Sequence, residues 1–174
     1  MKILVTGPQG SGKTTQAKLL SEFLRVPFIG MGGVLRERME QDDEIGNKIR
    51  EAMDKGVLVD DEIVANFTKQ KVLEDEKGYV MDGYPRSLYQ ANLFNPDFDK
   101  VFYLDISDGE VMSRLLKRGR ADDTSDLIKE RLAIYHQETE PLLSIYKEKA
   151  ILEVIDGSLS IEQIQERMRK ALNG

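Results

Sequence analysis

Residues 5–20, VTGPQGSGKTTQAKLL, constrain the fold more than any other stretch of the chain. From Gly7 to Thr14 they fill every fixed position of the pattern G-x-x-x-x-G-K-[ST]. Glycines let a backbone turn tightly around an anion and offer bare N–H groups to it, and a helix that begins there adds its positive end. A lysine suits terminal phosphates, and a threonine hydroxyl suits Mg²⁺. The stretch therefore predicts a nucleoside triphosphate site between a first strand and a first helix.

Short apolar runs alternate with helical patterns along most of the chain. Strands are expected at 2–6, 26–30, 78–82, 101–106 and 150–156, and helices are expected to begin near Lys13, Asp60, Asp108, Thr124 and Ser160. Because the runs are apolar almost throughout, they predict buried strands in a parallel sheet with helices on both faces. Ligands of such sheets bind at the carboxyl ends of the strands. The spacing of Ile161, Ile164, Met168 and Leu172 predicts a core-facing stripe on the last helix.

One region breaks this alternation. From Gly30 to about Val59 the chain has helical patterns and no strand, in GVLRERMEQ (33–41) and EIGNKIREAMDKG (44–56). We interpret this region as a small helical insertion outside the sheet. It is the first candidate for a second ligand-binding lobe.

Composition excludes several classes of function. The 174 residues carry a net charge of −6, which argues against a general binder of nucleic acid or anionic membranes. The chain has no cysteine and one histidine, so disulfides, thiolate zinc sites and His-rich metal sites are not expected. His136 lies beside the apolar stripe of Ile128, Leu132, Tyr135 and Leu142 and is interpreted as structural. Because no signal-peptide core or membrane-length apolar run is present, we expect a cytoplasmic protein.

The segment DGYPR (82–86) predicts a second part of the site. A strand ends at Asp82 and runs directly into a tight Gly/Pro turn that presents Arg86. Asp82 would lie beside the phosphate loop, where a carboxylate can hold Mg²⁺ through water. The planar guanidinium of Arg86 suits a phosphate better than a lysine does.

The segment RLLKRGRADDTSD (114–126) places four basic side chains before three acidic ones. Such crowding fits a salt-bridged surface turn. It fits equally a loop whose arginines face a ligand more negative than its aspartates. These residues alone leave both interpretations open.

Together these segments resemble the adenylate kinases, within the nucleoside monophosphate kinase family. The resemblance spans nearly the whole chain and rests on the phosphate loop and on VLRERM (34–39), GVLVDDEIV (56–64), DGYPRSLYQ (82–90), RLLKRGRADD (114–123), IKERLAIYHQETEPLL (128–143) and VIDG (154–157). It implies an α/β three-layer P-loop NTPase fold with a five-stranded parallel sheet and helices on both faces. The implied core is 1–29, 60–117 and 125–174, with a monophosphate-binding helical lobe at 30–59 and a minimal lid at 118–124.

The resemblance also implies the reaction ATP + AMP = 2 ADP, with Mg²⁺ accompanying ATP and no zinc. The acceptor is an anionic phosphate oxygen, so the transfer needs positioning and charge neutralisation and no general base. The implied partners are the nucleotides ATP, AMP and ADP. A monomer without nucleic-acid or membrane partners is expected.

Roles carry over from the family position by position. The implied catalytic residues are Lys13, Arg86, Arg118, Arg120 and Arg131. ATP would contact Gly10, Ser11, Gly12, Lys13, Thr14, Thr15, Arg114, Arg118 and Gly157. AMP would contact Met31, Arg36, Leu58, Val59, Gly83, Arg86, Gln90, Arg120 and Arg131, with Gln90 reading the base. Thr14 and Asp82 would hold Mg²⁺, the latter through water, and Asp122 and Asp123 would orient the lid arginines. A cis peptide bond is implied between Tyr84 and Pro85.

Simpler interpretations exist for some of these side chains. Arg36 can pair with Glu40 one helical turn later. Arg131 can form an exposed ion pair with Asp126 or Glu130, of the kind worth about 0–1 kcal/mol. The two lid aspartates can instead complement the N-terminus of the helix that begins near Thr124.

The chain departs from the family pattern after its second strand. Met31-Gly32-Gly33 stands where the family has Thr-Gly-Asp. Methionine offers no hydroxyl to a nucleoside, and the missing carboxylate at Gly33 removes a cap for the helix of Arg36. Gln90 favours adenine. The alternatives are a CMP/UMP or broad-specificity kinase and, from another class, a catalytically weak nucleotide-dependent assembly or switch protein.

The lid is the second departure. Only Gly119 separates Arg118 from Arg120, whereas short-lid relatives have several more residues there. The family role therefore transfers more firmly to Arg118 than to Arg120. A smaller lid excludes water less completely. We expect ATP hydrolysis without acceptor to exceed that of longer-lid relatives, and a coupled assay showing negligible acceptor-free hydrolysis would contradict this.

Overall fold

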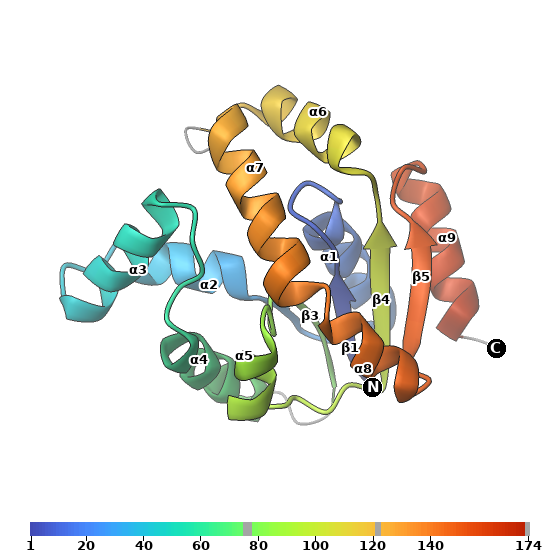
Figure 1. Ribbon diagram of the computed structural model, residues 1–174. Coiled ribbons are helices and arrows are strands. Elements are labelled where there is room, and N and C mark those ends of the chain that lie inside the picture. Colours follow the sequence, from blue (N-terminus) through green and yellow to red (C-terminus); the bar gives the residue numbers. More distant parts are fainter. Residues whose placement is uncertain (75–77, 121–122, 173–174) are drawn as a thin grey trace.

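The computed structural model describes residues 1–74, 78–120 and 123–172 (Figure 1). Within them, one parallel sheet has the strand order β2-β3-β1-β4-β5. The strands are β1 (Lys2–Thr6), β2 (Phe28–Gly30), β3 (Tyr79–Asp82), β4 (Lys100–Asp105) and β5 (Leu152–Asp156). All five predicted strands are confirmed, each within two residues at either end.

Helices connect and cover the strands. They are α1 (Lys13–Leu24), α2 (Met31–Arg38), α3 (Glu44–Asp54), α4 (Asp61–Glu74), α5 (Leu88–Leu93), α6 (Asp108–Arg118), α7 (Ser125–Ile134), the π-helical turn η1 (Tyr135–Thr139), α8 (Leu142–Glu148) and α9 (Ile161–Leu172). The five predicted helix starts are confirmed within one residue. Within the described ranges, no helix combines the length and apolarity that crossing a bilayer requires.

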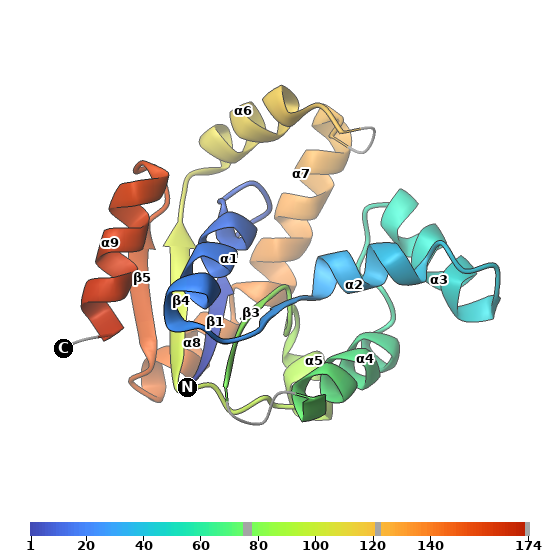
Figure 2. The ribbon, with the colours of Figure 1, turned by 180° about the vertical axis from the view of Figure 1, so that it is seen from behind.

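Helices cover both faces of the central strands, and successive strand residues point to opposite sides. Ile3 and Val5 of β1 belong to a cluster formed with α1 and α9, and Leu4 between them belongs to a cluster formed with α4 and α8. Figure 1 shows α7 and α8 in front of the sheet, and Figure 2 shows α1 in front from the opposite side. The predicted three-layer architecture is confirmed.

The register brings the carboxyl ends of the central strands together. Val5 of β1 pairs with Asp82 of β3, and Gly30 of β2 pairs with the same aspartate. The phosphate loop, the end of β3 and the start of α2 therefore leave the sheet at one edge. This is where parallel sheets of this class bind ligands.

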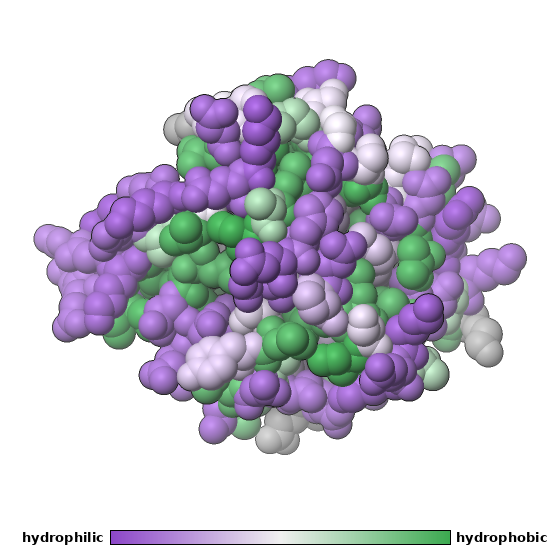
Figure 3. Space-filling model, in the orientation of Figure 1, coloured by the Kyte–Doolittle hydropathy of each residue, from purple (hydrophilic) through white to green (hydrophobic). Residues whose placement is uncertain are grey.

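The insertion consists of α2 and α3, which extend to the left of the sheet in Figure 1. Asp43 caps α3 by accepting a hydrogen bond from the Gly46 N–H (2.8 Å), and it also pairs with Arg38 (2.7 Å). Figure 3 shows the outer end of this region as largely hydrophilic. The helix cap was expected at position 33, and this position was wrong. The helix α2 begins earlier, at Met31, and its capping residue Gly30 provides no side-chain hydrogen bond.

Two expectations about burial were wrong. β5 lies at the sheet edge, and Val154 on it is 56% exposed. Ile161 is 49% exposed, although Ile164 and Met168 of the same stripe are buried. The reason is that the first turn of α9 docks on α1 through polar groups, since Gln16 Nε2 donates to the Ile161 carbonyl (3.2 Å).

The helix predicted over 128–143 is not a regular α-helix throughout. After α7 it continues as the π-turn η1, where the Glu140 N–H donates to the Tyr135 carbonyl (2.9 Å). Pro141 follows directly; it has no N–H, and its ring crowds the carbonyl four residues earlier. The predicted stripe is otherwise confirmed, since Ile128, Leu132 and Tyr135 are all buried.

Candidate active site

The phosphate loop is shaped by three glycines with positive φ: Gly7 (149°), Gly10 (84°) and Gly12 (90°). A Cβ on Gly7 would lie 2.8 Å from the Leu104 carbonyl oxygen and 2.9 Å from Ser11 Oγ, so space as well as φ requires glycine there. At Gly12 nothing lies within 4 Å, and only the backbone conformation excludes a side chain. The loop is thus packed against β4 and still leaves its last turn open.

Lys13 folds back over this loop, and its Nζ donates to the Pro8 carbonyl (3.1 Å). Burial lowers the pKa of Lys13 to about 8; Asp82 opposes the shift, and Arg86 and Arg118 add to it. A phosphate beside the ammonium would reverse the shift by stabilising its charge. Lys13 is therefore suited to an anion.

Asp82 and Thr14 meet at the end of β3, where the Thr14 hydroxyl donates to Asp82 Oδ2. Asp82 is 6% exposed, and its other oxygen, Oδ1, has no hydrogen-bond partner within the described residues. A carboxylate and a hydroxyl are the hard oxygen donors that Mg²⁺ prefers. The described ranges contain no group of three or more His, Cys, Asp or Glu side chains suited to a metal. A Mg²⁺ here would take its remaining ligands from water and nucleotide phosphates.

A cavity opens between the phosphate loop, the insertion and α7. Five cationic side chains line it: Lys13, Arg36, Arg86, Arg120 and Arg131. Its lining, as far as the structure describes it, includes no Asp or Glu. In a chain of net charge −6, this concentration of positive charge favours polyanionic ligands.

The arginines converge from separate elements. A Cβ on Gly32 would lie 3.5 Å from Arg36 Nη1 and 3.8 Å from Arg86 Nη2, so these two guanidinium groups lie close together. Arg36 thus turns back toward the start of α2 rather than on toward Glu40. Arg86 also donates from Nε to the Gly83 carbonyl (3.1 Å), and burial lowers its pKa, with Asp82 opposing. Two like charges held together in this way favour an anion between them.

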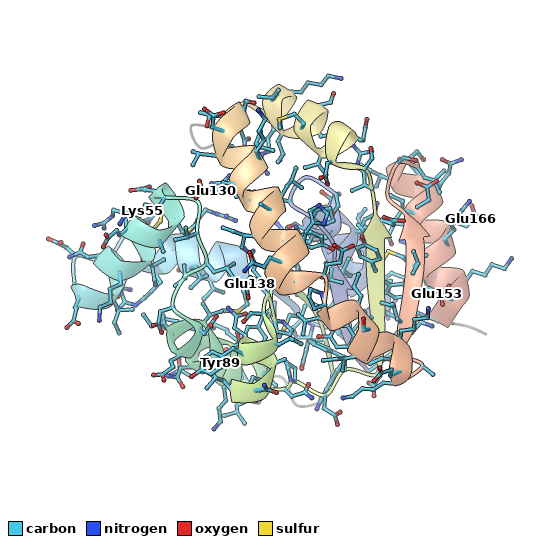
Figure 4. All side chains as sticks on the ribbon, in the orientation of Figure 1. Lys55, Tyr89, Glu130, Glu138, Glu153 and Glu166 are labelled. Atoms are coloured by element: carbon cyan, nitrogen blue, oxygen red, sulfur yellow. The ribbon has the colours of Figure 1, made fainter. Side chains whose placement is uncertain are left out.

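Arg131 approaches the same cavity from α7. A Cβ on Gly56, at the end of the insertion, would lie 3.5 Å from Arg131 Nε. The Arg131 side chain is 13% exposed, which does not fit the alternative of an exposed surface pair. Figure 4 labels Lys55, which precedes Gly56 on the insertion, and Glu130, which precedes Arg131 on α7.

Asp123 binds the residues on both sides of Gly119. Its side chain is fully buried and accepts two hydrogen bonds from Arg118 (2.8 and 2.6 Å) and one from the Arg120 N–H (3.1 Å). It also lies 3.9 Å from Arg131 Nη1. These contacts lower the pKa of Asp123, chiefly through the hydrogen bonds from Arg118. The helix cap of α7 is instead Thr124, which accepts from the Leu127 N–H (3.4 Å).

The two lid arginines take different positions, and Arg118 lies close enough to Lys13 to help lower its pKa. Arg120 lines the cavity, whereas Arg118 does not and is bound to Asp123. The physical reason is the turn: α6 ends at Arg118, and its C-cap Gly119, with a φ of 66°, sends the next side chain in a new direction. Asp122, the other predicted lid aspartate, lies outside the described residues.

The predicted monophosphate contacts mostly come together. Leu58, Val59, Gly83 and Gln90 line the cavity beside Arg36 and Arg86. Met31 does not: it is fully buried in the apolar cluster that contains Ile49 and Tyr84. Its side chain fills the core at the base of the insertion, and Gly32 lines the cavity in its place. The peptide bond between Tyr84 and Pro85 is cis, as predicted.

Other predicted contacts lie outside the cavity lining. These are Gly10, Ser11, Gly12, Thr14, Thr15, Arg114 and Gly157. Those from Gly10 to Thr15 belong to the loop and the start of α1. Arg114 pairs with Glu110 along α6 (2.8 Å), and the Gly157 N–H donates to the Asp105 carbonyl at the end of β4 (2.7 Å).

Sequence reasoning missed two lining residues of the π-turn. Tyr135 and Thr139 both line the cavity, and Thr139 Oγ1 donates to the Arg86 carbonyl (2.6 Å). Tyr135 was expected only to pack in the core. A proline directly after a helical pattern was the available signal, because it predicts an irregular turn there.

His136 is on the outer side of this turn. Its two ring nitrogens lie 2.7 Å from Glu140 and 3.0 Å from Asp108, and hydrogen bonding to these carboxylates, first Glu140, raises its pKa. It thereby ties the start of α6 to the end of η1 and does not line the cavity. This agrees with the structural role expected for it.

Comparison with known proteins agrees with this geometry. The family model described as adenylate kinase matches residues 5–151. The adenylate kinase of Prochlorococcus marinus (strain MIT 9301) is 37% identical over 177 residues, which cover 98% of this chain and 97% of that protein. That of Prochlorococcus marinus subsp. pastoris (strain CCMP1986 / NIES-2087 / MED4) is 42% identical over 166 residues, covering 90% of each. Adenylate kinase 1 of Nostoc sp. (strain PCC 7120 / SAG 25.82 / UTEX 2576) is 34% identical over 98% of each chain. This chain belongs to the adenylate kinase family.

Proposed function

We propose that this chain catalyses the reversible transfer of the γ-phosphoryl group of MgATP to AMP, which gives two ADP. One observation carries the proposal. Five cationic side chains and no described carboxylate line a cavity that begins at the phosphate loop and ends at Gln90. A single triphosphate at the phosphate loop does not require arginines from α2, from the turn after β3 and from α7, whereas a second phosphate group beside it does.

The triphosphate side is the phosphate loop. The N–H groups from Gly10 to Thr15 would hold the β- and γ-phosphates, and Lys13 would neutralise their charge. Arg114 and Gly157 would lie toward the nucleoside. Mg²⁺, when bound with ATP, would withdraw charge from the phosphates. Thr14 Oγ1 would hold it directly, and Asp82 would do so through water, which fits the unpartnered Oδ1 atom.

The monophosphate side is the arginine pair at Gly32. Arg36 and Arg86 would grip the AMP phosphate, and Leu58, Val59 and Gly83 would border the nucleoside. Gln90 would read the base. Met31 would support this pocket from the core, because its side chain is buried rather than exposed to the cavity.

Between the two nucleotides, Arg120 and Arg131 would stabilise the transferring phosphoryl group, with Arg118 joining them when it leaves Asp123. Arginines in this position can contribute about 10³-fold or more to the rate of phosphoryl transfer. The acceptor oxygen is ionised near neutral pH, so the residues supply position and charge and no proton acceptor.

The proposal includes the division of the chain. Residues 30–59 would close on AMP, the segment 118–124 would act as the lid with Asp122 and Asp123 orienting its arginines, and the remainder would be the rigid core. We infer that the enzyme works as a cytoplasmic monomer on ATP, AMP and ADP, without zinc and without nucleic-acid or membrane partners.

A broader acceptor range, including CMP or UMP, is the second candidate. It is favoured by Met31, which provides no hydroxyl to the nucleoside where the family has threonine. A catalytically weak switch protein is disfavoured, since binding one nucleotide does not require arginines on both sides of the transferred group.

The reverse reaction tests the proposal most simply. MgADP alone, followed by ³¹P NMR, should yield ATP and AMP in equal amounts. A nucleotide switch or an ATPase would leave ADP unchanged, and that outcome would overturn the proposal.

A further inference from the structure

The amide of Gln90 is held on two sides. Gln90 is 1% exposed and lines the cavity from α5. Its Oε1 accepts a hydrogen bond from the Arg86 N–H (2.8 Å), and its Nε2 donates to Asp61 Oδ1 (2.8 Å). A buried glutamine is thus fastened between a backbone donor and the carboxylate of another helix.

The chemistry of the two partners leaves the amide one orientation. A backbone N–H can only donate, so it must face the amide oxygen. An ionised carboxylate can only accept, so it must face the amide nitrogen. A flipped Gln90 would bring two donors together at Arg86 and two acceptors together at Asp61. Each mismatch would leave buried groups unsatisfied, which disfavours the flipped orientation.

The position of Asp61 favours its carboxylate. Asp61 is the first residue of α4, where a carboxylate is favoured by the positive end of the helix. Its neighbour Asp60 caps the helix by accepting from the Glu62 and Ile63 N–H groups (both 3.1 Å), so Asp61 is not needed as the cap. Glu138, marked in Figure 4, lines the same hollow as the two aspartates.

Half of the amide's hydrogen-bonding capacity remains. A glutamine amide has two N–H donors and two acceptor lone pairs, and the contacts above use one of each. Among the described residues no other group bonds to the second N–H or the second lone pair. The cavity is therefore offered one donor and one acceptor in a fixed order.

We propose that Asp61 determines base specificity at the monophosphate site, as a positioning residue that locks the Gln90 amide in the order suited to adenine. Adenine has an acceptor at ring N1 beside a donor at its 6-amino group. Guanine reverses both, with a donor at N1 beside its 6-oxo acceptor. An amide that cannot flip matches one of these edges in a given pose and opposes the other. This inference rests on the proposed function.

The test compares Asp61→Asn with Asp60→Asn, using AMP and GMP as acceptors and MgATP as donor. Asparagine at 61 keeps the shape and can donate or accept, so one of the two constraints on the Gln90 amide is removed and only the Arg86 N–H still opposes a flip. The ratio of kcat/KM for AMP to that for GMP should fall by about tenfold in Asp61→Asn, which is the scale of one buried hydrogen-bond mismatch. The change should come from KM, with kcat for AMP kept. Asp60→Asn still caps α4 and should keep the wild-type ratio.

The outcomes separate the two proposals. Wild-type protein that phosphorylates AMP, with an unchanged ratio in Asp61→Asn, overturns the role of Asp61 and leaves the proposed function standing. Wild-type protein that does not phosphorylate AMP overturns the proposed function, and the role of Asp61 falls with it. If Asp61→Asn does not fold by circular dichroism, Asp61→Ser replaces it, because serine also accepts or donates at the start of a helix. The same fall in the ratio is then expected.

Discussion

The phosphate loop and the arginine cluster are the two halves of one site, and they are built in opposite ways. The loop is eight consecutive residues, Gly7 to Thr14, and its shape is set by backbone conformation. The cluster takes Arg36 from α2, Arg86 from the turn after β3 and Arg131 from α7, and its shape is set by side chains that meet only in the folded chain. A substitution in the loop should therefore act by straining the backbone, and a substitution in the cluster should act by removing a positive charge.

The largest expected effect is in the cluster. Arg86→Ala should lower the rate of phosphoryl transfer by about 10³-fold or more, because under the proposal it removes the guanidinium that holds the acceptor phosphate beside the transferred group. Affinity for ATP should remain nearly intact, since the phosphate loop is untouched. A coupled ADP assay and calorimetric titration with ATP measure the two quantities. Arg167→Ala, on the exposed side of α9, is the control and should change neither. If Arg86→Ala still transfers phosphate at the wild-type rate, the role proposed for Arg86 in phosphoryl transfer is wrong.

The next effect should come from the loop. Gly7→Ala should lower the free energy of unfolding by up to about 3 kcal/mol, because alanine is strained at this φ and its Cβ would contact the Leu104 carbonyl. ATP affinity should fall with it. Gly109→Ala is the matched control, since nothing lies within 4 Å of its Cβ position and alanine favours helix. Denaturant unfolding measures the free energy of unfolding of both variants. Equal values for Gly7→Ala and Gly109→Ala would mean that strain does not shape the loop.

A substitution at Asp123 should change the free energy of unfolding less than Gly7→Ala does. Asp123→Asn should lower the free energy of unfolding at pH 7 by about 2 kcal/mol, because the charged hydrogen bonds from Arg118 are lost. The pKa of Asp123 is lowered on folding, so this stabilisation is present above the unfolded pKa of about 3.8 and is lost as pH falls through the folded pKa. The two proteins should therefore converge in acid. Asp126→Asn, on the exposed first turn of α7, should change little at any pH.

The smallest effect is a pH dependence of ATP binding. With the pKa of Lys13 at about 8 in the free protein and raised by bound phosphate, ATP affinity should fall as pH rises above that value. The expected slope is about tenfold per pH unit, with one proton taken up on binding. Lys13→Arg keeps its charge throughout this range and should show no such fall. Wild-type affinity that stays constant to pH 9 or beyond would contradict the assignment.

The difference between the two halves also explains what could be predicted from the sequence. The five strands and the phosphate loop follow from local patterns, in which apolar runs and glycine spacing act over a few residues. Thr14 and Asp82 are expected together because the phosphate loop follows β1 and Asp82 ends β3, and the carboxyl ends of parallel strands meet at one edge.

Tertiary packing decided what the sequence left unresolved. The φ of Gly119 turns Arg120 toward the cavity and leaves Arg118 on Asp123, and no spacing rule contains that direction. Met31 was placed beside a nucleoside by resemblance, yet its apolar side chain is buried in the core. The link between Gln90 and Asp61 joins residues 29 positions apart on two helices, and only the folded structure brings them into contact.

The most direct test of the central claim is an acceptor panel in which MgATP is offered with AMP, GMP, CMP and UMP in turn. The account predicts the highest kcat/KM for AMP, with two ADP formed for each AMP consumed. A protein that binds ATP and phosphorylates none of the four, or that prefers a pyrimidine, would contradict it.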